Sequence, residues 1–134
     1  MGRNAPSLTA LASVLHAPTL VAAGDISSAA DASQILKQAV HRFGKVDVLI
    51  NVAGSMNQDT ITGDVEPHTW WRDFEVNVHG TYNMVHYFIA ATGGKGTVIN
   101  VVSMGASFLV PGISSYSASK LAVVKLGEYL DLGI

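Results

Sequence analysis

The chain has 134 residues, of which 49% are hydrophobic and 13% are charged, and its net charge is −2. This length suits one domain, and the apolar content predicts a globular fold rather than a disordered chain. The basic residues are scattered, which argues against nucleic-acid binding, and no apolar run reaches the ~18 residues of a membrane-spanning helix. The absence of cysteine excludes disulfides and thiolate metal sites and fits the reducing cytoplasm, where we expect the protein.

The N-terminal part of the chain alternates between apolar runs and helical patterns. We interpret residues 1–15 as the end of a strand followed by its helix, and the apolar residues 18–27 as a short strand. The next helix begins at Ser28, which together with Asp31 resembles a capping box, and it ends at Gly44.

Two further apolar runs, residues 45–54 and 96–103, predict buried strands. The first is nearly continuous in Val, Leu and Ile, as expected of a parallel strand covered on both faces. A polar connection over residues 55–66 leads to a long helix over 67–92, and a final helix covers residues 114–132. This alternation of strands and helices predicts an α/β fold with a parallel sheet.

Ligands of such sheets bind beyond the carboxyl ends of the strands. The residues to examine are therefore those that follow the strands, namely Asp25, the segment 51–54 and Ser103.

Tyr116 and Lys120 stand four residues apart, so that they are neighbours on one face of the last helix. A nearby ammonium favours the phenolate and lowers the pKa of a tyrosine, which suits acid–base work on a carbonyl or an alcohol. The alternative is two solvated side chains on a surface helix. Asn77 lies inside the long helix although asparagine is a poor helix former, and its alternative is a tolerated surface residue.

Four motifs appear in a fixed order along the chain. They are "NVAG" after a strand, "VNVHGT" in a helix, "INVVS" at the next strand and "YSASK" opening the last helix. Together they resemble the short-chain dehydrogenase/reductase family over nearly the whole chain. The resemblance implies an incomplete Rossmann-like, doubly wound parallel sheet with flanking helices, and a partial NAD(P)-binding domain over residues 1–134.

The resemblance also implies roles for four residues in an oxidoreductase that interconverts a carbonyl and an alcohol. Tyr116 would be the catalytic acid/base, and Lys120 would bind the nicotinamide ribose and lower the pKa of Tyr116. Ser103 would position the substrate oxygen, and Asn77 would hold a water for proton relay.

Further residues would contact the cofactor, which is NADP or NAD. Asp25 and Ile26 would lie beside the adenine, and Arg3 resembles the basic residue of members that prefer NADP, which slightly favours NADP. Three further residues would shape the cofactor side of the sheet; they are Asn51, Ala53 and Gly54. Their motif, "NVAG", differs from the Asn-Asn-Ala-Gly that is common in the family by Val52.

The family begins with a strand and a TGxxxGxG turn that holds the pyrophosphate at a helix N-terminus, and this sequence contains no such segment. Its final strands are not recognisable either. We therefore expect a truncated reductase that binds cofactor poorly. In the family strand order 3-2-1-4-5-6-7, residues 18–27 would lack a neighbour and 45–54 would have an open edge.

The apolar segment 104–115 predicts a small apolar carbonyl or alcohol substrate. The helices that hold Asn77 and Tyr116 form subunit interfaces in the family, so a homo-oligomer is expected; the alternative is a non-catalytic chain that pairs with a full-length relative. A serine hydrolase is a further alternative, because Ser103 follows a strand, but the first Gly of G-x-S-x-G is missing. No metal site is expected, since His79 and His86 have no carboxylate at ligand spacing.

Overall fold

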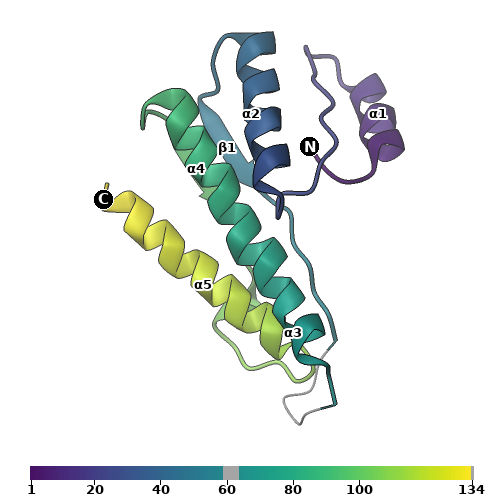
Figure 1. The fold of residues 1–134 in the computed structure, drawn as a ribbon, viewed down its shortest axis with the longest axis vertical. Helices are drawn as coiled ribbons and strands as arrows, with labels where there is room; N and C mark the ends of the chain where they lie inside the picture. Colours follow the sequence, from purple (N-terminus) through teal and green to yellow (C-terminus); the bar gives the residue numbers. More distant parts are fainter. Residues whose placement is uncertain (59–63, 134) are drawn as a thin grey trace.

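The computed structural model describes residues 1–58 and 64–133 (Figure 1). The predicted connection 55–66 thus lies partly outside the described residues. The elements follow the predicted alternation, and they are α1 (Ala5–Val14), α2 (Ala29–Phe43), β1 (Val48–Asn51), α3 (Pro67–Phe74), the π-helical segment η1 (Glu75–Gly80), α4 (Thr81–Thr92), β2 (Thr97–Asn100), the 3₁₀ turn η2 (Met104–Ala106) and α5 (Ser114–Asp131).

The sheet of the described residues consists of β1 and β2, which pair in parallel with Val48 opposite Thr97 and Asn51 opposite Asn100. Helices α2 and α4 pack against each other beside these strands (Figure 1). They enclose an apolar core, whose buried residues are Ala22, Ile26, Ala32, Ile35, Leu36, Leu49, Val76, Met84, Val85 and Phe88. The predicted α/β arrangement with a parallel sheet is confirmed.

The prediction that residues 45–54 are covered on both faces is wrong for the described residues. Leu49 is buried, but Val48 and Ile50 are 47% and 58% exposed. The helices that contact the strands most, α4 and α5, lie on the side of Leu49 and Val98. The opposite face of the sheet is therefore apolar and open.

The prediction of a strand over residues 18–27 is also wrong. Only an isolated parallel bridge forms there, between Gly2 and Ala23. The N–H of Gly24 donates to the carbonyl of Gly2 over 3.1 Å, and the N–H of Gly2 donates to the carbonyl of Ala22 over 3.4 Å. This segment consequently has a neighbour, contrary to expectation, but the neighbour is too short to build a ladder because α1 begins at Ala5.

The two ends of α2 form as the sequence predicts. The hydroxyl of Ser28 accepts from the N–H of Asp31, and Gly44 ends the helix at a φ of 81°. The capping box, however, is not reciprocal. The carboxylate of Asp31 accepts from the N–H of Asp25 over 2.9 Å and so ties α2 to the turn before it.

The long predicted helix 67–92 is continuous but changes its winding. The first part, α3, passes into six residues of π-helix, and these lead directly into α4. Asn77 lies in the π-helical segment, which is a departure that recurs at functional sites. Gly80 ends the segment, where a Cβ atom would lie only 2.6 Å from the side chain of Ile26.

Candidate active site

Tyr116 and Lys120 lie in the first turns of α5, where they share a face. Lys120 is only 5% exposed, and its Nζ donates to the carbonyl oxygen of Val101 over 3.0 Å. The same Nζ lies 5.8 Å from the centroid of the Tyr116 ring. The alternative of two solvated side chains is therefore wrong for Lys120, whose ammonium is held between the end of β2 and the tyrosine ring.

Burial lowers the pKa of Lys120 from its ordinary value, because a low-dielectric environment disfavours the charged form. The same environment strengthens the effect of that charge on its neighbours. The ammonium of Lys120 is thus a buried charge that lies next to the ring of Tyr116.

Asn77 is completely buried, contrary to the alternative of a surface residue. Its Oδ1 accepts from the N–H of Ser55 over 2.7 Å, and its Nδ2 donates to the carbonyl of Ser55 and to Oγ of Ser119, each over 2.8 Å. Ser119 in turn donates to the carbonyl of Tyr116 over 2.7 Å. Asn77 thus connects the loop after β1 to the helix of Tyr116 and Lys120.

Gly54 brings that loop close to the lysine. A Cβ atom at this position would lie 3.4 Å from both Oδ1 of Asn77 and Nζ of Lys120. The backbone of Gly54 therefore lies within van der Waals reach of both side chains. The predicted residues Gly54, Asn77, Tyr116 and Lys120 therefore form one connected group.

Ser103 stands near this group but is not bonded to it. Ser103 follows Val101, whose carbonyl binds Lys120, by two residues. Its Oγ accepts from the N–H of Gly105 over 3.1 Å. The hydroxyl retains its own proton to donate to a ligand. A three-residue 3₁₀ turn follows Ser103 where a nucleophile elbow would start a helix, which argues against a serine hydrolase.

Asp25 forms a second polar group on the surface. Its Oδ1 accepts from the N–H and the hydroxyl of Ser27 over 2.9 and 2.6 Å, and its Oδ2 lies 3.4 Å from Nη2 of Arg72. The hydrogen bonds from Ser27 lower the pKa of Asp25 from its ordinary value, with smaller contributions from the charges of Arg72 and Arg3. Arg72 also binds Glu75 over 2.8 Å.

The other residues assigned to the cofactor are placed differently. The side chain of Ile26 is buried in the core, and its carbonyl accepts from Nδ2 of Asn83 over 3.0 Å. Asn51 donates through Nδ2 to Oδ1 of Asn100 over 2.9 Å and so joins the two strands. Ala53 is exposed at the carboxyl end of β1. Asn51 and Ala53 nevertheless lie next to the group around Lys120. The N–H of Val101, whose carbonyl binds Lys120, donates to the carbonyl of Asn51 over 2.9 Å, and Ala53 directly precedes Gly54.

Sequence reasoning missed several residues of the site. Ser55 bonds to Asn77, and Ser119 bonds to the carbonyl of Tyr116. Asp73 bonds to Asn57 in the loop after β1, and Arg72 forms an ion pair with Asp25. A signal for Asp73 did exist, because it precedes Asn77 by four residues and so lies on the same helix face. Ser55 and Ser119 carry no such signal, since their partners lie far away in the chain.

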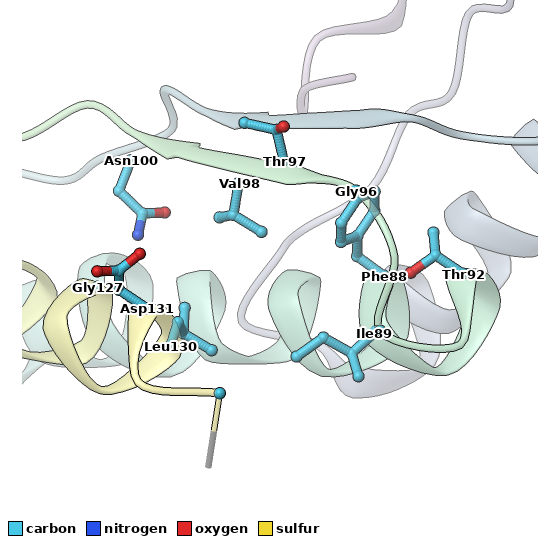
Figure 2. A pocket seen from close by; sticks show the side chains of 12 residues that line it. Phe88, Ile89, Thr92, Gly96, Thr97, Val98, Asn100, Gly127, Leu130 and Asp131 are labelled. Carbon is cyan, nitrogen blue, oxygen red and sulfur yellow. The ribbon is translucent and has the colours of Figure 1, made fainter.

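Two of the cavities that α5 helps to line bear on the site. One, of about 560 Å³, lies between β2 and the C-terminal ends of α4 and α5, where Asn100 and Asp131 face one another beside Val98 (Figure 2). None of the predicted site residues lines it. The other, of about 490 Å³, is mainly apolar and lies beneath the loop from Gly105 to Pro111, directly after Ser103.

The part of the chain that the structure describes contains no group of three residues suited to hold a metal ion. Within the same residues, no helix is long and apolar enough to cross a membrane.

A family model described as short chain dehydrogenase matches residues 1–132. The chain belongs to the short-chain dehydrogenase/reductase family. Among curated relatives, the Short chain dehydrogenase mpl6 of Monascus purpureus is 36% identical over 107 residues, which cover 78% of this chain and 36% of that protein. The 3beta-hydroxysteroid dehydrogenase 2 of Eggerthella lenta is 33% identical over 119 residues, which cover 82% of this chain and 45% of that protein.

Solved structures of the family have the same fold. A 3-ketoacyl-(acyl-carrier-protein) reductase from Brucella melitensis, complexed with NADH, superposes with a TM-score of 0.90 at 31% identity, over 98% of this chain and 56% of that one. A family member from Burkholderia phymatum in complex with NAD gives 0.86 at 27% identity, over 97% of this chain and 47% of that one. The chain thus spans about half the length of these neighbours and forms part of a Rossmann-like fold.

Proposed function

We propose that this chain carries the acid/base site of an NAD(P)-dependent oxidoreductase that interconverts a carbonyl and an alcohol. The observation that carries the proposal is the buried ammonium of Lys120, fixed by the carbonyl of Val101 beside the ring of Tyr116. A lysine is costly to bury, and here it is positioned where its charge acts on a phenol.

In the direction of reduction, the hydroxyl of Tyr116 donates its proton to the carbonyl oxygen of the substrate. Ser103 donates a hydrogen bond to the same oxygen. A reduced nicotinamide, when bound, supplies the hydride that reaches the carbonyl carbon. Both N–H groups of the Asn77 side chain are occupied, by Ser55 and Ser119, and its Oδ1 already accepts from Ser55. A water in the proton relay would therefore bind either the second lone pair of Oδ1 or the backbone of Asn77.

The residues at the site fit one end of the cofactor. Lys120 and Tyr116 can hold the nicotinamide ribose, and Gly54 leaves space for it at the open end of β1. The charge of Arg3 near Asp25 slightly favours NADP over NAD. The apolar cavity after Ser103 favours a small apolar substrate.

The test is a fluorescence titration of the purified chain with NADPH and NADH, followed by turnover assays with small apolar ketones and aldehydes. We expect Tyr116→Phe to lower turnover by roughly 10²–10⁴-fold, because the ring is kept and the proton donor is lost. Tyr129→Phe is the matched control, since Tyr129 is an exposed tyrosine on the same helix. Turnover that survives Tyr116→Phe would overturn the proposal.

A second candidate function is non-catalytic pairing, either with a second copy or with a longer relative. It is supported by a groove of about 620 Å³ along α3, η1 and α4, lined by large apolar side chains that include Trp71, Phe74 and Tyr82. Trp71 and Tyr82 are both more than half exposed. An assembly that persists in light scattering, but dissociates in Trp71→Glu, would support pairing through this face. A monomer at all concentrations, with no capture of a full-length relative, would contradict it.

A further inference from the structure

Asp73 is a buried carboxylate that the reaction does not use. It lies in α3 and is 0% exposed. Its two oxygens accept from the N–H of Asn57 over 3.1 Å and from Nδ2 of Asn57 over 2.9 Å. The same Nδ2 lies 3.4 Å from the carbonyl of Thr69. Burying a carboxylate away from water costs free energy. We therefore ask what Asp73 contributes to the segments that it connects.

Asp73 and Asn77 act on the same short loop. They are four residues apart in the continuous helix, and each holds one residue of the loop by two hydrogen bonds. Asn77 holds Ser55, and Asp73 holds Asn57. The loop from Gly54 to Asn57 is thereby fixed at both ends.

The position of this loop bears directly on Lys120. Gly54 precedes Ser55, and its backbone is close enough that a Cβ atom would lie 3.4 Å from Nζ of Lys120. The backbone of the loop therefore lies against the ammonium, which is 5% exposed, and we infer that the loop limits the access of water to it. If its far end were released, water would reach Lys120 more easily.

We propose that Asp73 is a positioning residue: by holding Asn57, it presses the loop 54–57 against Lys120 and keeps the ammonium dry beside Tyr116. The catalytic meaning of this contact rests on the proposed function, but the contact itself does not. Asp73 touches neither substrate nor cofactor, and it acts through the loop.

The structure offers a reciprocal exchange as a test. In Asp73→Asn, the new NH2 group faces one of the two N–H donors of Asn57. Two donors cannot pair, so one of the two hydrogen bonds is lost. In Asn57→Asp, two carboxylates face each other. The double variant Asp73→Asn/Asn57→Asp restores one acceptor–donor pair in the opposite sense and keeps the net charge of the parent.

The first readout is the NMR titration of the lysine side chains, which needs no cofactor. We expect the pKa of Lys120 to rise toward its ordinary value in Asp73→Asn, because water relieves the burial that lowers it. Loss of the carboxylate charge alone would lower that pKa instead, so the sign separates the two effects. The exposed lysines Lys37, Lys45 and Lys125 should not shift.

The second readout is hydrogen exchange of the Asn57 amide. Loss of its bond to Asp73 should accelerate exchange by about tenfold, and the double variant should restore both protection and the Lys120 titration. A Lys120 pKa that is unchanged or lowered in a folded Asp73→Asn would overturn the proposal, as would a double variant that restores neither quantity. If Asp73→Asn does not fold, Asn57→Ala keeps the backbone donor and should shift Lys120 less, in the same direction; no shift there would overturn it too.

These readouts separate the proposal from the reaction. A chain that fails to turn over but shows the reciprocal rescue retains the positioning role and contradicts only the proposed function.

Discussion

Two polar clusters of this chain lie on neighbouring turns of the same helix, and they differ in their burial and in the kind of contact that holds them. The buried cluster is held by hydrogen bonds of 2.7–3.1 Å and joins the loop after β1 to α5; its residues are Ser55, Asn57, Asp73, Asn77, Ser119 and Lys120. The second cluster, here called the exposed cluster, has ion-paired side chains that are 33–44% exposed, and it is held by ion pairs and by the hydrogen bonds from Ser27 to Asp25. Its residues are Arg3, Asp25, Arg72 and Glu75.

This difference in burial indicates which of the two clusters holds its side chains in a single arrangement. A buried polar group that loses its partner retains the full cost of its desolvation, so the buried cluster has one favoured arrangement. Exposed ions exchange their partners for water at little cost, and salt screens them. The acid/base pair therefore sits on a rigid support, whereas the proposed adenine end can rearrange around a ligand.

The largest expected effect comes from Asn77→Ala. This change leaves the N–H and carbonyl of Ser55 and the hydroxyl of Ser119 without their partner in a site closed to water. We expect the free energy of unfolding to fall by about 2–4 kcal/mol, almost independently of salt. Urea denaturation at low and high NaCl measures it.

The control for Asn77→Ala is Gln38→Ala, an exposed amide in the helix α2. It should change the free energy of unfolding by less than about 0.5 kcal/mol. If the Asn77→Ala chain were as stable as this control, the buried cluster would not be rigid. The proposed difference between the two clusters would then be contradicted.

An intermediate effect is expected from Lys120→Met, in the pH dependence of stability. Burial places the pKa of Lys120 below its ordinary value of 10.5, so between the folded and the ordinary pKa the unfolded chain binds more protons. The stability contributed by Lys120 should therefore rise with pH through this window. Lys120→Met should remove this rise, as thermal unfolding at a series of alkaline pH values would show. Lys125→Met, at an exposed lysine of the same helix, should leave the rise in place.

The smallest effect is expected from Arg72→Ala in the exposed cluster. It should cost about 1 kcal/mol or less, and the cost should vanish at high salt. The lowered pKa of Asp25 contributes stability that is present above its unfolded pKa and is lost as pH falls through the folded one. Without Arg72 the pKa of Asp25 should rise, yet the hydrogen bonds of Ser27 should keep it below the ordinary value. A salt-independent loss as large as that of Asn77→Ala would erase the distinction between the clusters.

Much of the candidate site could be predicted, but for unequal reasons. Helical spacing predicts only that Tyr116 and Lys120 are neighbours, and propensity marks Asn77 as a poor helix former inside a helix. The resemblance to the family implied the roles of these three residues. The role of Asp73 could not be predicted, because its partner Asn57 belongs to a polar connection whose path no local pattern specifies. The cofactor roles of Arg3, Asp25 and Ile26 stay predictions.

The sequence by itself determined the local features of this protein. Helix α2 begins at its Ser28 cap and ends at Gly44, and the strands lie in apolar runs, because these depend on interactions between residues close in the chain. Only the tertiary structure decided which face of the sheet is covered, that Gly2 lies beside Ala23, and that Gly54 approaches Lys120. Such contacts join distant segments, and their free energy depends on what else is packed nearby rather than on any local pattern.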